Sequence, residues 1–152
     1  MNKEVLHKAI DLLSRREHAV TELEKKLKSK DYELSDISEV MRFLIEKDYV
    51  SDRRYTETMI RSRTNKGYGW RYIQQELSHK GVENSLICEV LEELEIDWYA
   101  IAADTYQRKF SMKSIKDHKD KAKRIRFMQY RGFTSDIIFS VIENEQTDLV
   151  DY

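Results

Sequence analysis

The chain has 152 residues, of which 36% are charged and 40% hydrophobic, with 4 glycines and no proline. This composition is typical of amphipathic helices with solvated outer faces and few breaks. The sequence contains no apolar run of about 18 residues, which excludes a membrane-spanning helix. The N-terminal segment lacks the cleavage site of a signal peptide, and the single cysteine, Cys88, excludes an internal disulfide. We therefore expect a cytoplasmic protein.

The net charge of −1 conceals strong segregation of charge along the chain. Basic residues outnumber acidic ones in residues 53–80 and 108–131, whereas residues 83–97 and all residues after Arg131 contain no lysine or arginine. A total near zero argues against a simple nucleic-acid binder. The segregation nevertheless predicts separate basic and acidic surface patches.

Residues 1–50 are predicted to form a first unit of three short helices. Apolar residues at helical spacing predict a helix over Lys3–Ser14. Thr21, followed three residues later by Glu24, matches a capping box and predicts the start of the second helix. The third is predicted to begin at Ser35, after which apolar residues again recur at helical spacing.

Residues 51–96 are predicted to form a second three-helix unit. The pair Ser51-Asp52 predicts the N-terminus of its first helix. Its central helix lies within the segment GYGWRYIQQELSHKGV, residues 67–82, and Gly81 is expected to end this helix in a left-handed conformation. The third helix is predicted over Glu83–Leu94.

Residues 97–146 are predicted to form a third unit, followed by a frayed polar tail at 147–152. Its first helix, starting after Asp97, is apolar on two sides and should therefore also contact the preceding unit. A loop is expected over Ser111–Lys116, a basic helix over Asp117–Arg131, and a last helix from Thr134 to about Glu143.

A threefold internal repeat relates these units. The segments Leu27-x-x-Lys30-Asp31-Tyr32, Leu77-x-x-Lys80-Gly81-Val82 and Met128-x-x-Arg131-Gly132-Phe133 follow one another at steps of 50 and 51 residues. The sequence therefore predicts an all-α chain of three tandem three-helix repeats. Because each repeat can bury little surface alone, we expect an elongated row whose repeats contact only their neighbours.

No pattern in the sequence predicts a metal site, a cofactor or catalysis. The spacing of the histidines does not suggest paired metal ligands, and Cys88, beside the apolar stripe of Ile87 and Val90, is expected to be a packed thiol. Gly67-Tyr68-Gly69 lacks the third glycine and the preceding strand of a dinucleotide-binding motif, so a turn between helices is the better interpretation. The histidines are His7, His18, His79 and His118.

The basic residues are the main candidates for contact with a partner. Arginines cluster near predicted loops, and their planar guanidinium groups suit carboxylate or phosphate. Tyr68, Trp70 and Tyr72 interleave with Lys66 and Arg71, a pattern that can stack on bases or anchor a protein interface. The alternatives are that the charged runs are solvated faces and that Trp70 and Tyr72 belong to the core.

Several segments resemble the signature segments of the bacterial RecX regulatory proteins, in order and at suitable distances. The resemblance extends over essentially the whole chain. It departs at Asp31, where the later repeats have Gly81 and Gly132, and in the last dozen residues. The segments that carry it are Leu12-Leu13-Ser14-Arg15-Arg16-Glu17, Glu22-Leu23, Ser51-Asp52-Arg53-Arg54-Tyr55, Gly67-Tyr68-Gly69, Arg71-Tyr72-Ile73, Glu76-Leu77, Lys80-Gly81-Val82 and Arg131-Gly132-Phe133.

The resemblance implies an elongated, curved array of the three repeats and a regulator without catalysis or cofactor. Proteins of this family bind along the groove of the RecA–DNA filament and lower recombinase, ATPase and coprotease activity, and some bind DNA directly. It implies a monomer in the cytoplasm, acting in homologous recombination, DNA repair and the SOS response. Its partners would be the RecA filament and, weakly, single- or double-stranded DNA.

The resemblance and the charge pattern together select a set of candidate residues. The basic block at residues 108–131 is predicted to face either the filament or the solvent. The glycines expected to be structural are Gly67, Gly69, Gly81 and Gly132. The candidate partner- or nucleic-acid-binding residues are Arg15, Arg16, Arg53, Arg54, Arg61, Arg63, Lys66, Trp70, Arg71, Lys80, Arg124 and Arg131.

Two functions from different classes remain open at this stage. One is a filament regulator directed at protein, with secondary contact to DNA. The other is a helical-repeat DNA- or RNA-binding module that affects a recombinase by competing for nucleic acid. Binding that depends mainly on contacts to DNA should weaken steeply as salt rises, because it releases counterions. Binding that depends mainly on contacts to protein should persist.

Overall fold

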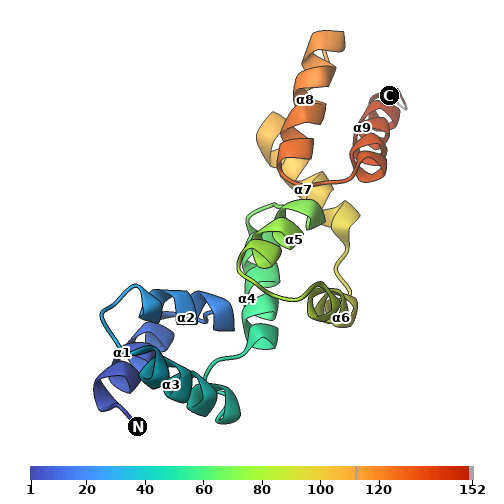
Figure 1. The fold of residues 1–152 in the computed structure, drawn as a ribbon. Coiled ribbons are helices and arrows are strands. Elements are labelled where there is room, and N and C mark those ends of the chain that lie inside the picture. The colour runs from blue at the N-terminus through green and yellow to red at the C-terminus, as the bar shows by residue number, and fades with distance from the viewer. Residues whose placement is uncertain (112, 151–152) are drawn as a thin grey trace. The chain divides into compact units, whose positions relative to one another are not determined.

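The computed structural model describes residues 1–111 and 113–150, without the side chains of residues 145–150 (Figure 1). The described residues form only helices, which confirms the all-α prediction. None of these helices is long and apolar enough to cross a membrane. In chain order they are α1 (Lys3–Arg15), α2 (Val20–Lys28), α3 (Leu34–Glu46), α4 (Asp52–Asn65), α5 (Trp70–His79), α6 (Asn84–Leu94), α7 (Trp98–Phe110), α8 (His118–Tyr130) and α9 (Ser135–Val150).

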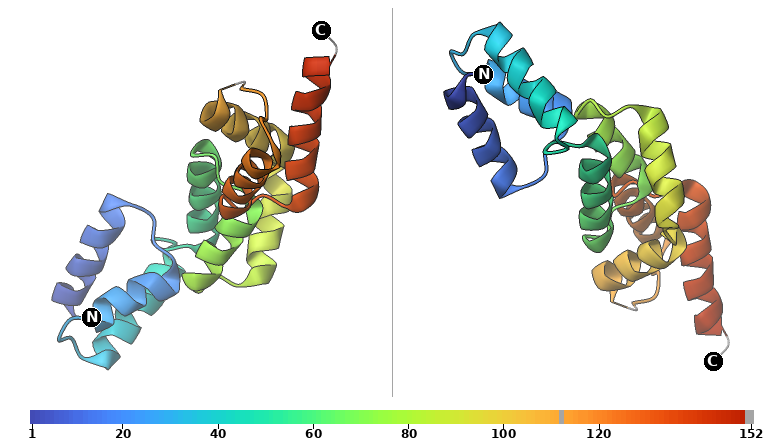
Figure 2. Two further views of the ribbon diagram at one scale, coloured as in Figure 1. Left: turned by 90° about the horizontal axis from the view of Figure 1, so that it is seen from above. Right: turned by 90° about the horizontal axis from the view of Figure 1, so that it is seen from below.

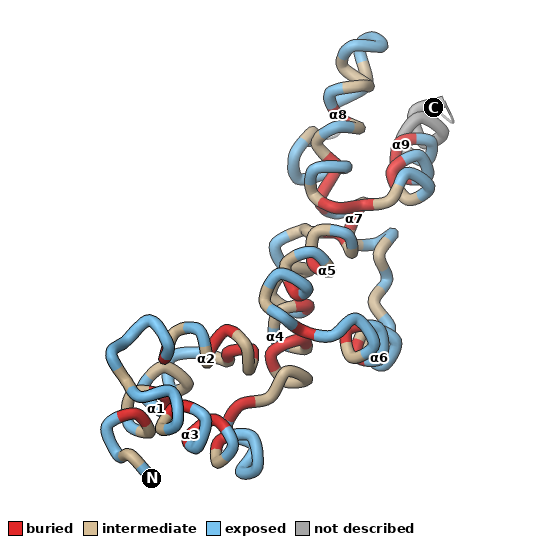
Figure 3. The backbone as a smooth tube through the Cα atoms, viewed as in Figure 1, coloured by how far each residue is buried: buried red, intermediate tan, exposed pale blue. Residues whose placement is uncertain are grey.

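Helices α1, α2 and α3 pack against one another around a common apolar core (Figures 1 and 2). Leu23, Leu27 and Leu44 are fully buried in it, as the helical spacing predicts. The buried positions, red in Figure 3, alternate with exposed ones along each of these helices. The first helix is capped by Asn2, whose side chain accepts hydrogen bonds from the backbone N–H groups of Glu4 and Val5.

The predicted cap of the second helix was wrong: the N-cap is Ala19, two residues before Thr21. Helix α2 begins at Val20, so Thr21 lies inside it. The partner of the cap is Glu22, not Glu24, because the Glu22 carboxylate accepts from the backbone N–H of Ala19 at 3.3 Å. A second acceptor comes from far along the chain, since the Asp52 carboxylate accepts from the Val20 N–H at 2.8 Å. Tertiary contacts thus replace the local hydroxyl cap.

Helices α7, α8 and α9 enclose a second core. Met128, Ile138 and Ile142 are almost fully buried there, and α9 packs against both α7 and α8. Helix α9 runs to Val150, beyond the predicted end near Glu143, so residues 147–150 of the expected frayed tail are helical. No glycine or proline interrupts this segment, which lets the helix continue. Residues 151–152 lie outside the described part of the chain.

The chain divides into two compact units that do not coincide with the sequence repeats. Unit 1 comprises residues 1–59 and 77–94, and unit 2 comprises residues 60–76 and 95–152. Both α4 and α5 are therefore shared between the units, and the middle repeat contributes to each. The boundaries of the repeats at residues 50 and 96 remain a prediction from the sequence pattern.

Within unit 2, α7 contacts the middle repeat, as expected from its two apolar sides. The Thr105 hydroxyl lies 3.2 Å from the carbonyl oxygen of Gly67, to which it donates. The ring of Trp98 lies 5.9 Å from that of Trp70, centroid to centroid. The candidate residue Trp70 is thus half-buried against a neighbouring aromatic side chain.

Candidate functional site

Two of the candidate cations in unit 1, Arg16 and Lys80, converge on one buried carboxylate. The side chain of Glu22 is only 5% exposed, and its oxygens accept from the Arg16 guanidinium at 2.7 and 3.2 Å. The Lys80 ammonium lies 3.1 Å from the same carboxylate. Burial by itself would raise the pKa of Glu22, but the hydrogen bonds and charges of Arg16 and Lys80 lower it to about 2. These two cations therefore hold the fold together around Glu22.

The arginine pair 53–54 is also bound to carboxylates of unit 1. Arg54 donates from Nε to Glu17 at 2.8 Å and from Nη1 to Asp48 at 3.2 Å. Arg53 reaches two exposed carboxylates of α6, Glu93 at 2.7 Å and Glu89 at 2.8 Å. Arg54 thereby ties the start of α4 to the loop between α1 and α2 and to the turn after α3, and Arg53 ties α4 to α6.

A buried histidine completes the polar interior of unit 1. His18 is 1% exposed, with Nδ1 at 3.0 Å from the carbonyl oxygen of Arg16 and Nε2 at 2.9 Å from the Lys26 ammonium. Burial lowers the pKa of His18, so the ring is neutral at pH 7. The neutral ring can donate from Nδ1 and accept from Lys26, an arrangement that positions the loop between α1 and α2.

In unit 2 the candidate Arg63 is half-buried and paired. Its guanidinium donates to both oxygens of the Glu76 carboxylate, from Nη2 to Oε1 at 2.6 Å and from Nε to Oε2 at 3.1 Å, which ties the end of α4 to α5. A bidentate pair of this kind is stronger and more directional than a single hydrogen bond. Arg63 therefore fixes the geometry of the middle repeat.

Arg131 forms a hydrogen bond within the fold and is also partly exposed to solvent. Its Nη1 donates to the carbonyl oxygen of Lys66 at 2.9 Å, and its guanidinium lies over the rings of Tyr68 and Phe127, at 4.6 and 5.2 Å from the centroids. The stacked guanidinium has only part of its donor capacity in use. Tyr68 in turn stacks on Tyr72 at 4.2 Å.

The glycines lie where a side chain has no room. Gly132 has φ of +96°, and a Cβ there would come within 2.5 Å of the Tyr72 backbone nitrogen. Gly69 lies against the backbone of Gly132 in the same close contact. Its N–H donates to the carbonyl of Arg131 at 2.7 Å. Gly81 ends α5 with φ of +85°, the left-handed conformation expected from the sequence. Gly67, at φ of +84°, lies against Thr105.

Arg124 is a core residue, which excludes it as an exposed contact. It is 3% exposed and donates to the Tyr106 hydroxyl at 2.8 Å and to the carbonyl oxygens of Lys113 and Ser114 at 2.8 and 3.2 Å. It also pairs with Asp120 at 3.2 Å. The helical spacing of α8 places position 124 on the inner face, opposite the solvated cations.

Cys88 is exposed, so the prediction of a packed thiol was wrong. The buried stripe of α6 contains Ile87 and Val90, and position 88 lies one residue off that stripe on the solvent side. Among the described residues, no group of three or more His, Cys, Asp and Glu side chains is arranged to hold a metal ion.

The remaining candidates lie at the surface. Arg61, Lys66 and Arg71 are exposed, and the exposed Arg15 forms a single ion pair with Asp11, one turn earlier, at 2.9 Å. Such exposed pairs contribute little to stability and are readily exchanged for a partner. These four cations are thus less engaged by the fold than the paired arginines at 16, 53, 54 and 63.

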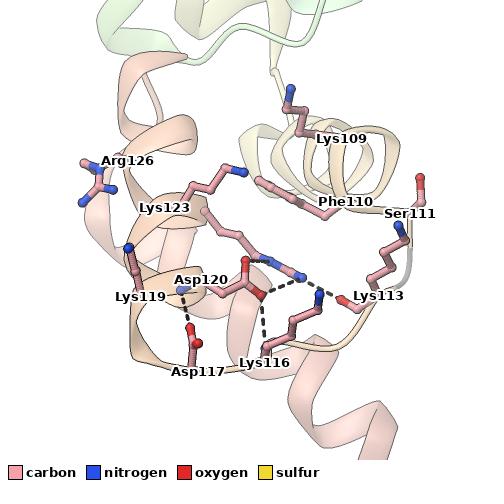
Figure 4. Close-up of a pocket in the computed structure, with 11 residues that line it drawn as sticks. Lys109, Phe110, Ser111, Lys113, Lys116, Asp117, Lys119, Asp120, Lys123 and Arg126 are labelled. Carbon is pink, nitrogen blue, oxygen red and sulfur yellow. Dashed lines mark hydrogen bonds and ion pairs between the residues drawn. The ribbon is translucent and has the colours of Figure 1, made fainter.

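A basic hollow that the sequence-based candidates largely missed lies between the end of α7 and α8. It encloses about 500 Å³ and is lined by seven basic and two acidic side chains (Figure 4). Figure 4 shows Lys123 pointing toward Lys109 and Phe110, whereas Lys119 and Arg126 lie before and after it along α8, on the side of the helix away from Phe110. The lining comprises Lys109, Phe110, Ser111, Lys113, Lys116, Asp117, Lys119, Asp120, Lys123, Arg124 and Arg126.

A second, smaller hollow of about 290 Å³ shares Lys109 with the first. It is lined by the candidate residues Lys66 and Arg131, together with Arg108 and Phe127. Cations therefore continue from α8 past the end of α7 to the loop before α5, all within unit 2. The helical spacing of Lys119, Lys123 and Arg126 in the sequence was the signal that could have identified this surface.

Models of protein families and individual proteins match the chain along most of its length. The RecX first, second and third three-helix domains match residues 6–44, 51–91 and 95–142. A regulatory protein RecX of Vibrio parahaemolyticus serotype O3:K6 is 41% identical over 140 residues, covering 92% of this chain and 90% of that protein. Another, from Pseudomonas putida, is 38% identical over 144 residues, covering 95% and 91%.

Solved structures share the fold. The crystal structure of RecX from Lactobacillus salivarius has a TM-score of 0.76 at 23% identity, covering 95% of this chain and 96% of that chain. A second crystal structure, of a regulatory protein RecX, has a TM-score of 0.74 at 19% identity, covering 93% and 71%. These likenesses and the domain matches confirm an all-α fold of three tandem three-helix repeats. The chain belongs to the RecX family of regulatory proteins.

Proposed function

We propose that this protein is a non-catalytic regulator that binds the RecA–DNA filament along its groove and lowers recombinase, ATPase and coprotease activities. The observation that carries the proposal is the match of all three domains to one regulatory family. The matched relatives are named regulatory proteins, and the match covers nearly their whole length. Such a regulator would work in the cytoplasm as a monomer, in recombination and DNA repair.

The surface chemistry is consistent with a filament as partner. A row of helical units offers several weak contacts at once, and linked contacts add through effective concentration. Exposed cations at Arg61, Lys66 and Arg71 can meet acidic protein surface or phosphate. The paired arginines at 16, 53, 54 and 63 contribute instead by keeping the units in their folded geometry.

The second candidate function is a nucleic-acid-binding module that acts by competition for DNA or RNA. The observation that favours it is the basic hollow of unit 2, where seven cationic side chains meet two carboxylates. In this mode the protein would inhibit RecA only by occupying the nucleic acid, and the inhibition would disappear as the salt concentration rises.

The deciding experiment measures binding to the RecA filament on single-stranded DNA and to the same DNA bare, across a salt series, with strand exchange followed in parallel. The regulator proposal expects filament binding and slowed exchange at salt that abolishes binding to bare DNA. The R61A/R71A variant should weaken filament binding without changing the helix content. The control is K25A/K47A, which removes two exposed lysines of unit 1. Equal affinities with equal salt dependence would overturn the proposal and favour the second function.

A further inference from the structure

We infer that the exposed face of α8, together with the basic hollow beside it, is a binding surface for single-stranded nucleic acid, with phosphates held by Lys119, Lys123 and Arg126 and an unpaired base stacked on Tyr130. The inference deepens the proposed function, because it names the surface of this regulator that would meet DNA directly. It rests on three observations about unit 2.

The first observation is the alignment of these four side chains on one face of a helix. Positions 119, 123, 126 and 130 are separated by four, three and four residues, which places them within a narrow stripe. Along the helix axis they follow one another at roughly 5 Å. All four residues are exposed, and Tyr130 is 86% exposed. A regularly spaced row of cations matches the regular charges of a phosphate backbone.

The second observation is that these cations are not neutralised within the protein. None of Lys119, Lys123 and Arg126 forms an ion pair with any side chain that the structure describes, unlike Arg16, Arg53, Arg54 and Arg63. The two carboxylates of the hollow are engaged locally. Asp120 pairs with the buried Arg124, and Asp117 accepts from the backbone N–H of Asp120 at 2.8 Å. The hollow therefore carries an excess of positive charge.

The third observation is how the hollow is built. Its wall contains the buried guanidinium of Arg124, which lies 4.8 Å from the ring centroid of Phe110 and holds the carbonyl oxygens of Lys113 and Ser114. These bonds fix the loop between α7 and α8, so Lys113 and Lys116 have a defined position beside the helix. Opposite them Lys109 lies over the ring of Phe127, 5.2 Å from its centroid. The cations thus line a preformed concave surface.

Tyr130 makes the single-stranded form the better fit. Duplex DNA hides the faces of its bases, whereas an unpaired base can stack on an exposed aromatic ring, and such stacking tolerates any sequence. Tyr130 follows the cationic stripe directly, so a strand that lies on Lys119, Lys123 and Arg126 would bring a base to the ring. An acidic protein surface could use the same cations, but its carboxylates offer no flat ring to stack on Tyr130.

The test uses the full chain without RecA and a fluorescent oligothymidylate as the probe. K119A/K123A/R126A should bind it at least about tenfold more weakly at low salt, and the magnitude of the salt slope should fall by about 2, since about 0.7 counterions are released per phosphate contact on a single strand. The control K3A/K25A/K47A removes the same charge from exposed positions of unit 1 and should leave affinity nearly unchanged.

Substitutions of Tyr130 test whether base stacking contributes to binding. Y130A should weaken binding by at least about fivefold, Y130F should retain it, and the affinity for a duplex of the same length should not respond to either change. Equal losses in both triple variants would show that only net charge matters and would overturn the inference. An unchanged affinity of K119A/K123A/R126A for the strand would equally overturn it. If that variant also lost binding to the RecA filament, the face would be assigned to protein contact.

The outcome is independent of the filament proposal. If K119A/K123A/R126A loses binding to the bare strand but still binds the filament and slows strand exchange at high salt, the nucleic-acid surface and the filament surface are separate. If the unaltered protein fails to bind the filament but binds the strand through this face, the proposed function fails and the inference stands.

Discussion

The buried carboxylate of Glu22 should be a main source of stability in unit 1, and replacing it with glutamine tests this directly. E22Q keeps the size of the side chain and removes its charge, which leaves the guanidinium of Arg16 and the ammonium of Lys80 without their shared partner. Removing one member of a buried ion pair costs about 3–5 kcal/mol because the remaining charge stays desolvated. Both cations here are partly exposed, so we expect a loss of about 3 kcal/mol at pH 7.

The pKa of Glu22 gives a second route to the same magnitude. It is about 2 in the folded protein against 4.5 for an ordinary glutamate. A depressed pKa means that the folded state favours the ionised form, so the contribution is present above the unfolded pKa and is lost as the pH falls through the folded one. The shift corresponds to about 3 kcal/mol at neutral pH, falling to about 1 kcal/mol at pH 3 and to well under about 1 kcal/mol at pH 2.

The assay is urea-induced unfolding followed by circular dichroism, at pH 7 and at pH 3. E24Q is the matched control, because Glu24 lies on the same helix but forms an exposed pair with Lys28 at 2.9 Å. It should cost under about 0.5 kcal/mol at either pH. The gap between the unaltered protein and E22Q should shrink by more than half from pH 7 to pH 3. Equal stabilities of E22Q and E24Q at pH 7, or a gap independent of pH, would refute the reasoning.

Three further outcomes are expected. G132A should lower the stability of unit 2 by at least about 2 kcal/mol, measured by thermal unfolding, because the added Cβ meets the Tyr72 backbone at 2.5 Å and φ is +96°; an unchanged Tm would show that this contact relaxes freely. R124M should speed amide hydrogen exchange in the loop between α7 and α8, since the guanidinium holds two of its carbonyl groups; the exposed R126M should not, and equal exchange in both would contradict the structural role of Arg124. Cys88 should react with a thiol reagent in the native protein nearly as fast as in urea, because it is exposed; strong native protection would contradict its position.

The paired arginines change how substitutions in this family member should be interpreted. An alanine at position 53 or 54 removes a contact to carboxylates on another element as well as any contact to a partner. A lost activity in such a variant would not by itself locate a binding surface. Substitutions at the exposed Arg61, Arg71 and Arg126 remove no side-chain hydrogen bond among the residues that the structure describes, so they report more directly on partners.

The sequence alone was sufficient to identify the helices and their repeat. Apolar residues at helical spacing, glycines after the repeat endings and the steps of 50 and 51 residues each arise from local geometry, which the order of residues encodes directly. Gly81 illustrates this, since a left-handed helix end favours glycine wherever the helix packs. The same local signals supported membership in the family.

The tertiary structure decided which cations are available. Arginine looks the same in sequence whether it is solvated or bonded, and the carboxylates that engage Arg53 and Arg54 lie up to 40 residues away in the chain. The cap of α2 depends in the same way on Asp52, 32 residues from Val20. The C-terminal end of α9 could not be predicted either, because the residues after Glu143 are mostly polar and show no apolar residues at helical spacing. Electrostatic pairing acts through space. The helical spacing on α8 could suggest a basic face, but which cations are free of carboxylate partners could be decided only once the helices were placed.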